Sequence, residues 1–438
     1  MPRDQIKNIR TIVVMVTWNG LELLKQSLGK LKEQTSREFG IVVVDNGSND
    51  KTREFLQQAT IESNHVGIPL WGLFCQENQG FALANNLGLN FITEFLEPDF
   101  FILLNNDTLP EEDFIEKMQE KADYYYQRNL EDKKLFPFLS QKEWRVGALA
   151  PLIENYFAKG IVDSAGIKIY PDGSAINRGI GNSKKFFTKE KEVFGPTGAA
   201  NLYFRKTLID TVLPFKKIAI LQEFKPSAAI EFTEREKRIQ SNFLFEAIIR
   251  ESIPHKNLRI LPLKEFLASS YFAYYEDVDL AFRMRLRLWG TVFVPQIRIL
   301  HHHSATGKAY SPFKSFLIHR NQYFNLFRDF PGHYLLYGLL SAVKRYFFLF
   351  KSLLRKKGPT AELVKNNGKR KVFFLVIKGL FSLIKELSNL LQDRKNIQAN
   401  RLLTFDEFRE IIQYPTFKAS LQKMIFSVPH FLQKKQKD

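Results

Sequence analysis

Cysteine is almost absent from this 438-residue chain, in which Cys75 is the only one. No intrachain disulfide can form, so an oxidising compartment is not implied. Long apolar runs are also missing. Residues 334–350 and 372–391 are rich in Phe and Leu, but basic residues interrupt both, so neither supplies the roughly twenty apolar residues that a membrane span needs. The N-terminal stretch MPRDQIKNIR has no apolar signal core, and we therefore expect a cytoplasmic protein.

The formal charge of +18 is concentrated near the C-terminus. From Gly332 onward there are 21 Lys and Arg residues against 7 Asp and Glu, whereas the first 331 residues carry a net charge of only +4. This asymmetry is typical of a basic module that docks on an anionic surface. Basic residues beside Phe- and Leu-rich faces suit helices that lie in a membrane interface, and an ordinary small helical domain is the alternative. A nucleic-acid-binding protein would also be basic, but no recognised nucleic-acid-binding motif is present.

Strands and helices alternate over the first quarter of the chain. The expected strands cover residues 11–16, 41–44, 70–74 and 100–104, and the expected helices cover 21–34, 52–59 and 81–95. Such alternation argues for parallel βαβ units, and hence for an α/β fold with a Rossmann-like doubly wound sheet. A further helix is expected within residues 232–251, and strands are expected at 201–205 and 292–300.

The stretch from Phe100 to Thr108, FFILLNNDT, runs from five apolar residues straight into Asn105, Asn106 and Asp107. A short apolar run bounded by polar turn residues reads as a strand buried on both faces. Asp107 then lies at the C-terminal edge of the strand, where open α/β sheets bind their ligands. A carboxylate with carboxamide neighbours suits a hard divalent cation that bridges to a substrate phosphate. An Asx turn that merely closes the strand is the alternative.

Polar loops follow the other predicted strands as well. Residues 17–19 follow the first strand, residues 45–48 follow the second, and residues 78–86 (NQGFALANN) form a glycine loop that opens into a helix. Asp45 could accept a hydrogen bond from a base or a ribose hydroxyl, while Gly80 permits close approach of the backbone. Each loop alone is an ordinary βα turn. Together, the loops indicate a ligand site at one edge of the sheet.

These motifs resemble those of the family 2 inverting nucleotide-sugar glycosyltransferases. The matching segments, in order, are VVMVTWN, VVVDNGSNDKT, NQGFALANNLG, LLNNDT, GPTGAANLYFRK, YYEDVDLAFRMRLRLWG and LHHHSATG. The resemblance covers roughly residues 11–327 and lies nearest to the bacterial rhamnosyltransferase-like branch, which builds cell-surface polysaccharides. It implies a GT-A-type catalytic domain over 1–330, with a donor half at about 1–150 and an acceptor half at about 151–330. An insertion at about 215–268 and a basic helical region at 331–438 complete the expected organisation.

The resemblance also implies roles for individual residues. Thr17, Asn19 and Asp45 would hold the nucleoside, and Asn78, Gly80 and Asn85 would line the same pocket. Asp107 matches the last acidic residue of the family's metal-binding triplet, so a Mg²⁺ or Mn²⁺ ion is expected. The remaining predicted substrate-binding residues are Asn106, Gly198, Ala199 and Glu276. Small residues at 198–200 could admit an acceptor sugar, or could simply permit close backbone packing.

Asp277 is the predicted catalytic residue of the acceptor half, and a run of histidines contains the predicted metal ligand. An inverting transfer needs a carboxylate that removes the proton of the acceptor hydroxyl, and Asp277 matches the family's base. Capping of the following helix is the alternative role. Histidine is a plausible metal ligand. Of His301, His302 and His303, the resemblance favours His301, because the family's histidine comes directly after the apolar strand, and His302 is second. Arg283 and Arg285 are expected to face solvent rather than a phosphate.

The sequence therefore predicts a metal-dependent hexosyl- or deoxyhexosyltransferase. It would use a nucleoside-diphosphate sugar and a glycan or lipid-linked acceptor, as a peripheral protein at the inner face of the cell membrane and without nucleic acid. A sugar-nucleotide-binding pseudoenzyme and a basic nucleic-acid-binding protein are the alternatives.

Overall fold

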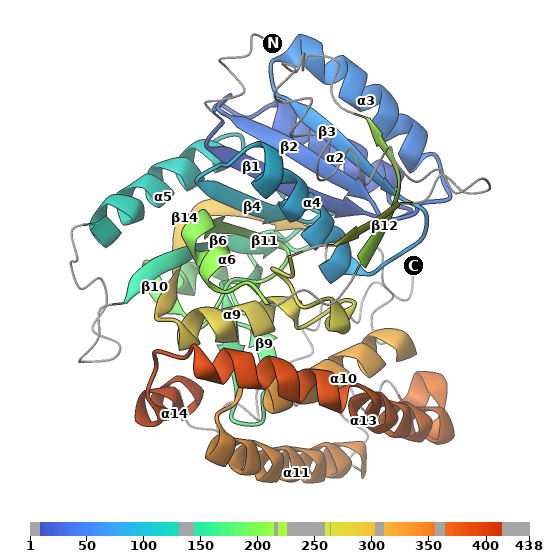
Figure 1. Cartoon of the computed structure of the whole chain (residues 1–438), viewed down its shortest axis with the longest axis vertical. Helices are drawn as coiled ribbons and strands as arrows, with labels where there is room; N and C mark the ends of the chain where they lie inside the picture. The colour runs from blue at the N-terminus through green and yellow to red at the C-terminus, as the bar shows by residue number, and fades with distance from the viewer. Residues whose placement is uncertain are drawn as a thin grey trace.

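The computed structural model describes residues 9–130, 144–213, 218–225, 259–262, 264–302, 311–354 and 364–413. The helix expected within 232–251, most of the predicted insertion and His303 lie outside the described residues. Figure 1 shows a body of strands and covering helices in its upper part and a group of helices below it.

Four parallel strands form the N-terminal part of the central sheet, in the order β4-β1-β2-β3. They are β1 (Thr11–Thr17), β2 (Phe39–Asp45), β3 (Leu70–Cys75) and β4 (Phe100–Leu104). Every residue in these strands is buried, as expected for continuous apolar runs in a sheet that is covered on both faces. The four predicted strands are confirmed.

Helices cover both faces of the parallel strands. Successive strand residues point to opposite faces, so Val13 and Val14 enter different cores. The core around Val14 includes α4 (Phe81–Phe95), whose bounds are those expected from the sequence. The core around Val13 includes helices α2 (Leu21–Lys32), α3 (Thr52–Val66) and α5 (Phe114–Leu130). The arrangement is the predicted doubly wound one.

The second half of the chain extends the sheet from β4 with mixed strand directions. β11 (Ala200–Phe204) pairs antiparallel with β4 and with β6 (Arg145–Asn155), and β14 (Trp289–His301) runs parallel to β6. Short strands complete this side: β5 (Thr108–Pro110), β7 (Val162–Ser164), β10 (Lys191–Val193) and the separate hairpin β8 (Ile167–Ile169) with β9 (Ala175–Asn177).

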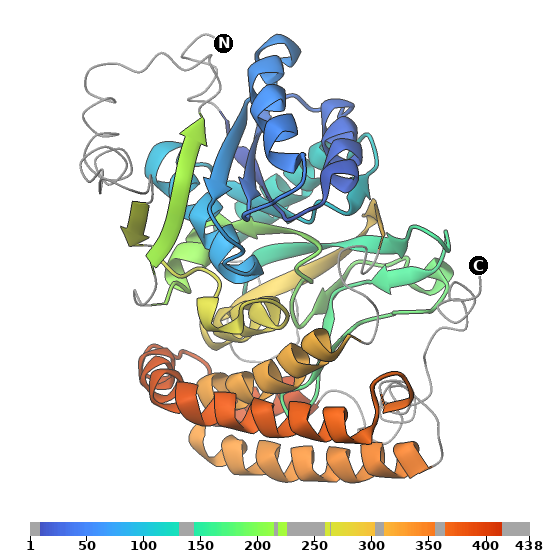
Figure 2. The ribbon, with the colours of Figure 1, turned by 90° about the vertical axis from the view of Figure 1, so that its right-hand side faces the viewer.

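Two strands from the predicted insertion lie at the opposite edge of the sheet. β12 (Ile218–Lys225) pairs antiparallel with β3 and with β13 (Arg259–Pro262). Figure 2 shows β12 beside the parallel strands and above α10, α11 and α13. With these additions, the predicted α/β fold with a mostly parallel central sheet and C-terminal helices is confirmed.

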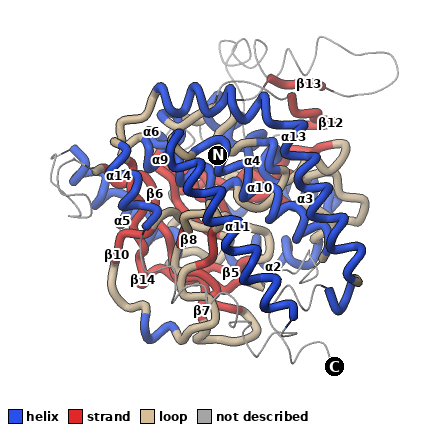
Figure 3. The backbone as a smooth tube through the Cα atoms, turned by 90° about the horizontal axis from the view of Figure 1, so that it is seen from below, coloured by secondary structure: helices blue, strands red, loops and turns tan. Residues whose placement is uncertain are grey.

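The lower part of the molecule is helical. It contains η2 (Ser269–Tyr271), α9 (Glu276–Leu286), α10 (Pro312–Asp329), α11 (Gly332–Leu354), α13 (Lys369–Ala399) and α14 (Phe405–Gln413). Figure 3 views this end directly and shows α11 running across it, with α10 and α13 nearby. Phe282, Phe330 and Phe408 share one core cluster, so the C-terminal helices pack against α9 and α10. None of the described helices is both long and apolar enough to cross a membrane.

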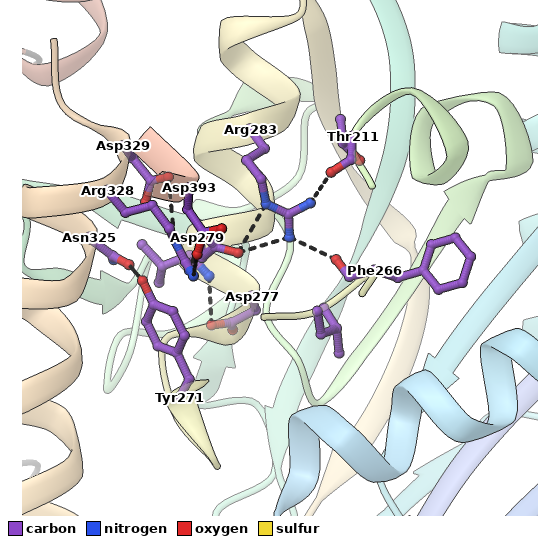
Figure 4. A network of polar contacts seen from close by, with 12 residues as sticks. Thr211, Phe266, Tyr271, Asp277, Asp279, Arg283, Asn325, Arg328, Asp329 and Asp393 are labelled. Atoms are coloured by element: carbon purple, nitrogen blue, oxygen red, sulfur yellow. Dashed lines mark hydrogen bonds and ion pairs between the residues drawn. The ribbon is translucent and has the colours of Figure 1, made fainter. Parts of the chain in front are cut away.

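A buried ionic network joins α9 to the helices below it (Figure 4). Asp279 accepts hydrogen bonds from Arg283, 3.0 Å from Nε and 2.8 Å from Nη2, and it also contacts Arg328 of α10. Arg328 is fully buried, and its Nη1 lies 3.7 Å from the Asp393 carboxylate of α13. The network fixes α9 against α10 and α13.

The expectation that Arg283 and Arg285 face solvent is wrong. Arg283 is 3% exposed and Arg285 is 4% exposed. Arg285 forms an ion pair with Glu192, and both guanidinium groups donate to backbone carbonyls of other segments. Partners far away in the sequence satisfy these charges, so α9 can be buried on all sides.

Candidate active site

A cleft of about 690 Å³ opens where the loops after the parallel strands meet the start of α9, the β8-β9 hairpin and the start of α10. Its size is typical of a small-molecule site. Seven of the predicted site residues line it: Asn78, Asn106, Asp107, Gly198, Ala199, Glu276 and Asp277. The donor-side and acceptor-side predictions thus meet in one cavity.

Asp107 and His301 lie side by side although they are far apart in the sequence. β5 follows Asp107 directly and pairs antiparallel with β14, so that Thr108 lies opposite His301. The Nε2 atom of His301 lies 3.2 Å from Oδ1 of Asp107, and its Nδ1 atom lies 2.6 Å from Oδ2 of Asp163. All three side chains are buried. His301 is therefore held between two carboxylates.

Each group in this cluster changes the charge state of its neighbours. Burial lowers the pKa of His301, but hydrogen bonding to Asp107 and Asp163 outweighs burial and raises that pKa to about 10. Burial raises the pKa of Asp107, but the contact with His301 outweighs it and the pKa falls below its ordinary value. Asp107 is thus an ionised carboxylate at neutral pH.

Asp163 was missed by the sequence interpretation. It lies on β7, which pairs with β6, and β6 also pairs with β14. No motif surrounds it, so its place beside His301 follows only from long-range strand pairing. A carboxylate on the second nitrogen of a histidine fixes the ring orientation, which is the usual support for a metal-ligating histidine.

The other histidine candidate has a different environment. His302 stacks on Tyr156, with ring centroids 3.9 Å apart, and meets the edge of Phe157. Its backbone N–H donates to the carbonyl oxygen of Asp107 at 2.9 Å. His302 therefore packs against aromatic rings, whereas the His301 ring faces Asp107.

The residues at this point fit a divalent cation. Oδ1 of Asn105 is buried without a hydrogen-bond partner, Oδ1 of Asp107 is buried beside His301, and both residues line the cleft. Among the described residues, no cluster of three or more His, Cys, Asp or Glu side chains is arranged to hold a metal. A carboxylate and an imidazole would leave the other coordination positions to water and a substrate diphosphate, as is common for Mg²⁺.

Asp277 lies at the start of α9 and faces the same cleft. Its Oδ2 atom accepts a hydrogen bond from the backbone N–H of Gly198 at 2.8 Å, and Oδ1 accepts from Val278 at 2.8 Å. Burial raises the pKa of Asp277, and these two backbone donors oppose the rise. The N-cap position belongs to Tyr275, so Asp277 is not the capping residue of this helix.

Glu276 is buried beside Asp277, and its Oε2 atom has no hydrogen-bond partner. Burial, followed by the charge of Asp277, raises the pKa of Glu276 well above its ordinary value. The charge of Asp277 therefore disfavours ionisation of the adjacent Glu276.

The donor-side loops are tied together by amide side chains. Asn106 donates from Nδ2 to Oγ1 of Thr17 at 3.0 Å. Asn46, which the sequence interpretation passed over beside Asp45, donates to Oδ1 of Asn78 at 3.0 Å and accepts from the backbone N–H of Gln79 at 2.9 Å. These bonds bring the loops after β1, β2, β3 and β4 to one edge.

Three other predicted donor residues are not among those that line the cleft. Asp45 is fully buried, accepts from the backbone N–H of Ser48 at 3.2 Å and lies 3.5 Å from Arg53. Asn85 donates to the Phe81 carbonyl within α4. Asn19 adopts a φ of 48° and accepts from the backbone N–H of Asn49.

Gly80 meets protein rather than open space. Its φ is 87°, and a Cβ atom there would lie 2.6 Å from the Phe272 carbonyl oxygen and from the Phe272 ring. The close approach expected from this glycine is therefore to the segment that precedes α9.

Lys314, another residue missed from the sequence, enters the cleft from the first turn of α10. Its Nζ atom lies 5.2 Å from the Tyr274 ring centroid. Burial lowers the pKa of Lys314, while Asp163 and Asp107 oppose that shift. A cation here faces the cluster where a diphosphate would be held.

One family model matches the parallel half of the chain. Residues 12–129 match the model of the family described as "Glycosyl transferase family 2". This segment contains the four parallel strands and Asp107. No match is found among curated protein sequences.

The chain path also resembles that of several solved structures. A mannosyltransferase from Pyrobaculum calidifontis in complex with GDP-Man and Mn²⁺ is 15% identical, with a TM-score of 0.42, over 89% of this chain and 85% of the other. Residues 1–349 of S. aureus TarS in complex with UDP are 14% identical, with a TM-score of 0.41, over 91% and 94%. Likeness at this level does not bear on donor or acceptor.

Proposed function

We propose that this protein is an inverting glycosyltransferase that moves a hexosyl or deoxyhexosyl group from a nucleoside-diphosphate sugar to a glycan or lipid-linked acceptor. The observation that carries the proposal is that Asp277 and Asp107 line one cleft, with His301 against Asp107. The proposal takes Asp277 as the base and Asp107 with His301 as the cation site, on either side of one substrate. A role in cell-surface polysaccharide synthesis rests on the resemblance of the motifs to the rhamnosyltransferase-like branch.

In this mechanism Asp277 accepts the proton of the acceptor hydroxyl while the hydroxyl oxygen bonds to the anomeric carbon. The bond from that carbon to the diphosphate oxygen breaks in the same step, so the nucleoside diphosphate leaves with the electron pair. A Mg²⁺ or Mn²⁺ ion held by Asp107 and His301 would stabilise the negative charge of the leaving group. Lys314 faces the same cluster and would add a positive charge there.

A donor screen tests the proposal directly. UDP-, dTDP- and GDP-sugars should be compared by thermal shift, each with and without Mn²⁺. A ligand that binds only the native state adds ~2.7 kcal/mol of stability at a hundredfold excess over its dissociation constant, so the true donor should stand out. Release of nucleoside diphosphate must then be observed with an acceptor. Binding without any release would indicate the pseudoenzyme alternative.

Asp107→Ala should remove the cation dependence of nucleotide binding. We expect Mn²⁺ to strengthen binding of the nucleoside diphosphate to the wild type and to have almost no effect on the variant. Asp163→Asn should weaken the cation effect by ~10–100-fold, because the histidine loses the carboxylate that orients it. Calorimetric titration measures both constants without requiring turnover. An equal Mn²⁺ effect in the wild type and in Asp107→Ala would contradict the assignment.

The C-terminal helices support the proposal of a peripheral membrane protein. Helices α11 and α13 expose apolar side chains at intervals of three, four or seven residues: Leu336, Leu340, Val343, Phe347 and Leu354 on α11, and Phe374, Phe381, Ile384 and Leu391 on α13. Exposed lysines, including Lys344, Lys351, Lys378 and Lys385, lie on the same helices, and α11 has no acidic residue. Apolar and cationic groups together suit an anionic lipid surface, which at the inner face of the cell membrane would present a lipid-linked acceptor.

The membrane proposal predicts a loss of liposome binding when aromatic residues are removed. Phe347→Ser with Phe381→Ser should weaken co-sedimentation with anionic vesicles on the order of tenfold, because each exposed Phe would insert part of its apolar surface. The matched control is Ile61→Ser with Phe186→Ser, since these exposed residues lie on other parts of the protein. Equal binding by the two double variants would reject this surface, and a halved molar mass of the first variant would instead indicate self-association.

A further inference from the structure

The segment just before the candidate base has an unusual backbone. Phe272, Tyr274 and Tyr275 adopt φ values of 65°, 66° and 73°, in the left-handed region that bulky side chains rarely occupy. Glu276 and Asp277 follow immediately. A strained backbone persists only where the surrounding structure holds it in place.

Two neighbouring residues of α10, Arg320 and Asn321, bind much of this backbone segment through their side chains. Nδ2 of Asn321 lies within hydrogen-bonding distance of three carbonyl oxygens, at 3.1 Å from Tyr271, 2.9 Å from Ala273 and 2.6 Å from Tyr274. Arg320 donates from Nη2 to the carbonyls of Ser270, at 3.1 Å, and Tyr271, at 2.7 Å. Asn321 is fully buried, so water does not compete for these contacts.

The carbonyl of Phe272 accepts its hydrogen bond from α4 rather than from Asn321 or Arg320. The backbone N–H of Ala82, in α4, donates to the Phe272 carbonyl at 3.1 Å, beside the tight contact with Gly80. The carbonyls of residues 270–274 therefore all accept from groups distant in sequence. The segment also lines the cleft with Phe272, Ala273, Tyr274 and Tyr275.

We propose that Asn321 is a positioning residue for Asp277: by holding the carbonyls of residues 271, 273 and 274, it fixes the backbone path that places the carboxylate against Gly198. This inference rests on the proposed function, since it takes Asp277 as the base. An amide fits the position because its N–H groups point at carbonyl oxygens. An isosteric carboxylate would present only acceptors to the same three oxygens.

A residue that positions Asp277 and a residue that only stabilises the fold would affect different steps of the reaction. Asn321 touches the segment before Asp277, whereas Asp107 directly precedes β5 and His301 ends β14, and these two strands pair with each other. Loss of Asn321 should therefore impair proton removal in the transition state and leave cation-dependent binding of the nucleotide unchanged. A residue that acts only in the transition state changes kcat rather than donor affinity.

The test compares the wild type, Asn321→Ala, Asn321→Asp, Asp277→Asn and a matched control, Asn129→Ala. Asn129 also bonds a distant backbone, donating to the Val146 carbonyl at 2.8 Å, and it does not line the cleft. We expect both Asn321 variants to lose tenfold or more in kcat, with the dissociation constant of the nucleoside diphosphate and Mn²⁺ within twofold of wild type. Asn129→Ala should keep kcat within twofold.

Hydrogen exchange supplies a readout that does not depend on turnover. In Asn321→Ala, peptides covering residues 270–277 should exchange faster, while those covering β1 and β4 should be unchanged. Wild-type kcat in Asn321→Ala, or equal losses in Asn129→Ala, would overturn the inference. If the Asn321 variants do not fold, Arg320→Ala should show the same pattern more weakly, and its absence there would also overturn it. If the wild type transfers no sugar, the proposed function fails instead, which is a different result.

Discussion

Replacing Asp277 by Asn should lower the rate of sugar transfer by ~10²–10⁴-fold, the usual contribution of a positioned general base. The asparagine keeps the size of the side chain but cannot take a proton from the acceptor hydroxyl. Binding of the nucleoside diphosphate should be nearly unchanged, because Asp107, just before β5, and His301, at the end of β14, are held by the pairing of these two strands. Release of nucleoside diphosphate in the presence of acceptor measures the first effect, and calorimetry measures the second.

The pH dependence of the wild-type transfer rate should also reflect the role of Asp277 as the base. Burial raises the pKa of Asp277, and a base works only when it is deprotonated. The rate should therefore fall as the pH drops through this raised pKa, at a higher pH than for an exposed aspartate. Asp210→Asn is the charge-matched control, since Asp210 pairs with Arg287 and does not line this cleft. Transfer by Asp277→Asn at the rate of Asp210→Asn would refute the base assignment.

Replacing Arg328 by Met should lower the free energy of unfolding by ~3–5 kcal/mol, the cost of breaking a buried ion pair from one side. Asp279 and Asp393 would keep their burial but lose a shared positive partner. Urea unfolding measures the change. The matched control is Arg10→Met, because Arg10 and Asp99 are about half exposed and such pairs contribute only ~0–1 kcal/mol. Similar losses in the two variants would show that the network does not stabilise the fold.

The sequence predicted the parallel half of the fold well. Strands such as 100–104 are continuous apolar runs, and helix 81–95 begins directly after Gly80, so the local sequence pattern alone defines these elements. Contacts between residues on different strands were harder to predict from the sequence. Asp163 reaches His301 only because β7, β6 and β14 lie side by side, and β12 pairs with β3 although more than a hundred residues separate them.

The same reason explains the wrong expectation for Arg283 and Arg285. Solvent exposure was expected for them because charged side chains of a helix normally lie on its solvent side. Their partners, Asp279 and Glu192, and the carbonyls of other segments decide the matter, and only Asp279 is close in sequence. Asn321 was missed similarly, because its contacts are to backbone atoms of another segment and no residue pattern encodes them.

The pairing of β5 with β14 has a consequence for how the protein matures. Asp107 is synthesised early and His301 almost two hundred residues later, yet the two side chains become neighbours through a single ladder. Contacts between such distant segments form late in folding, because a long loop must first be closed. A nascent chain whose parallel strands have formed should therefore contain Asp107 but not yet have His301 beside it. Affinity for a divalent ion would then be gained only when both halves have joined, which would delay any chemistry until the protein is whole.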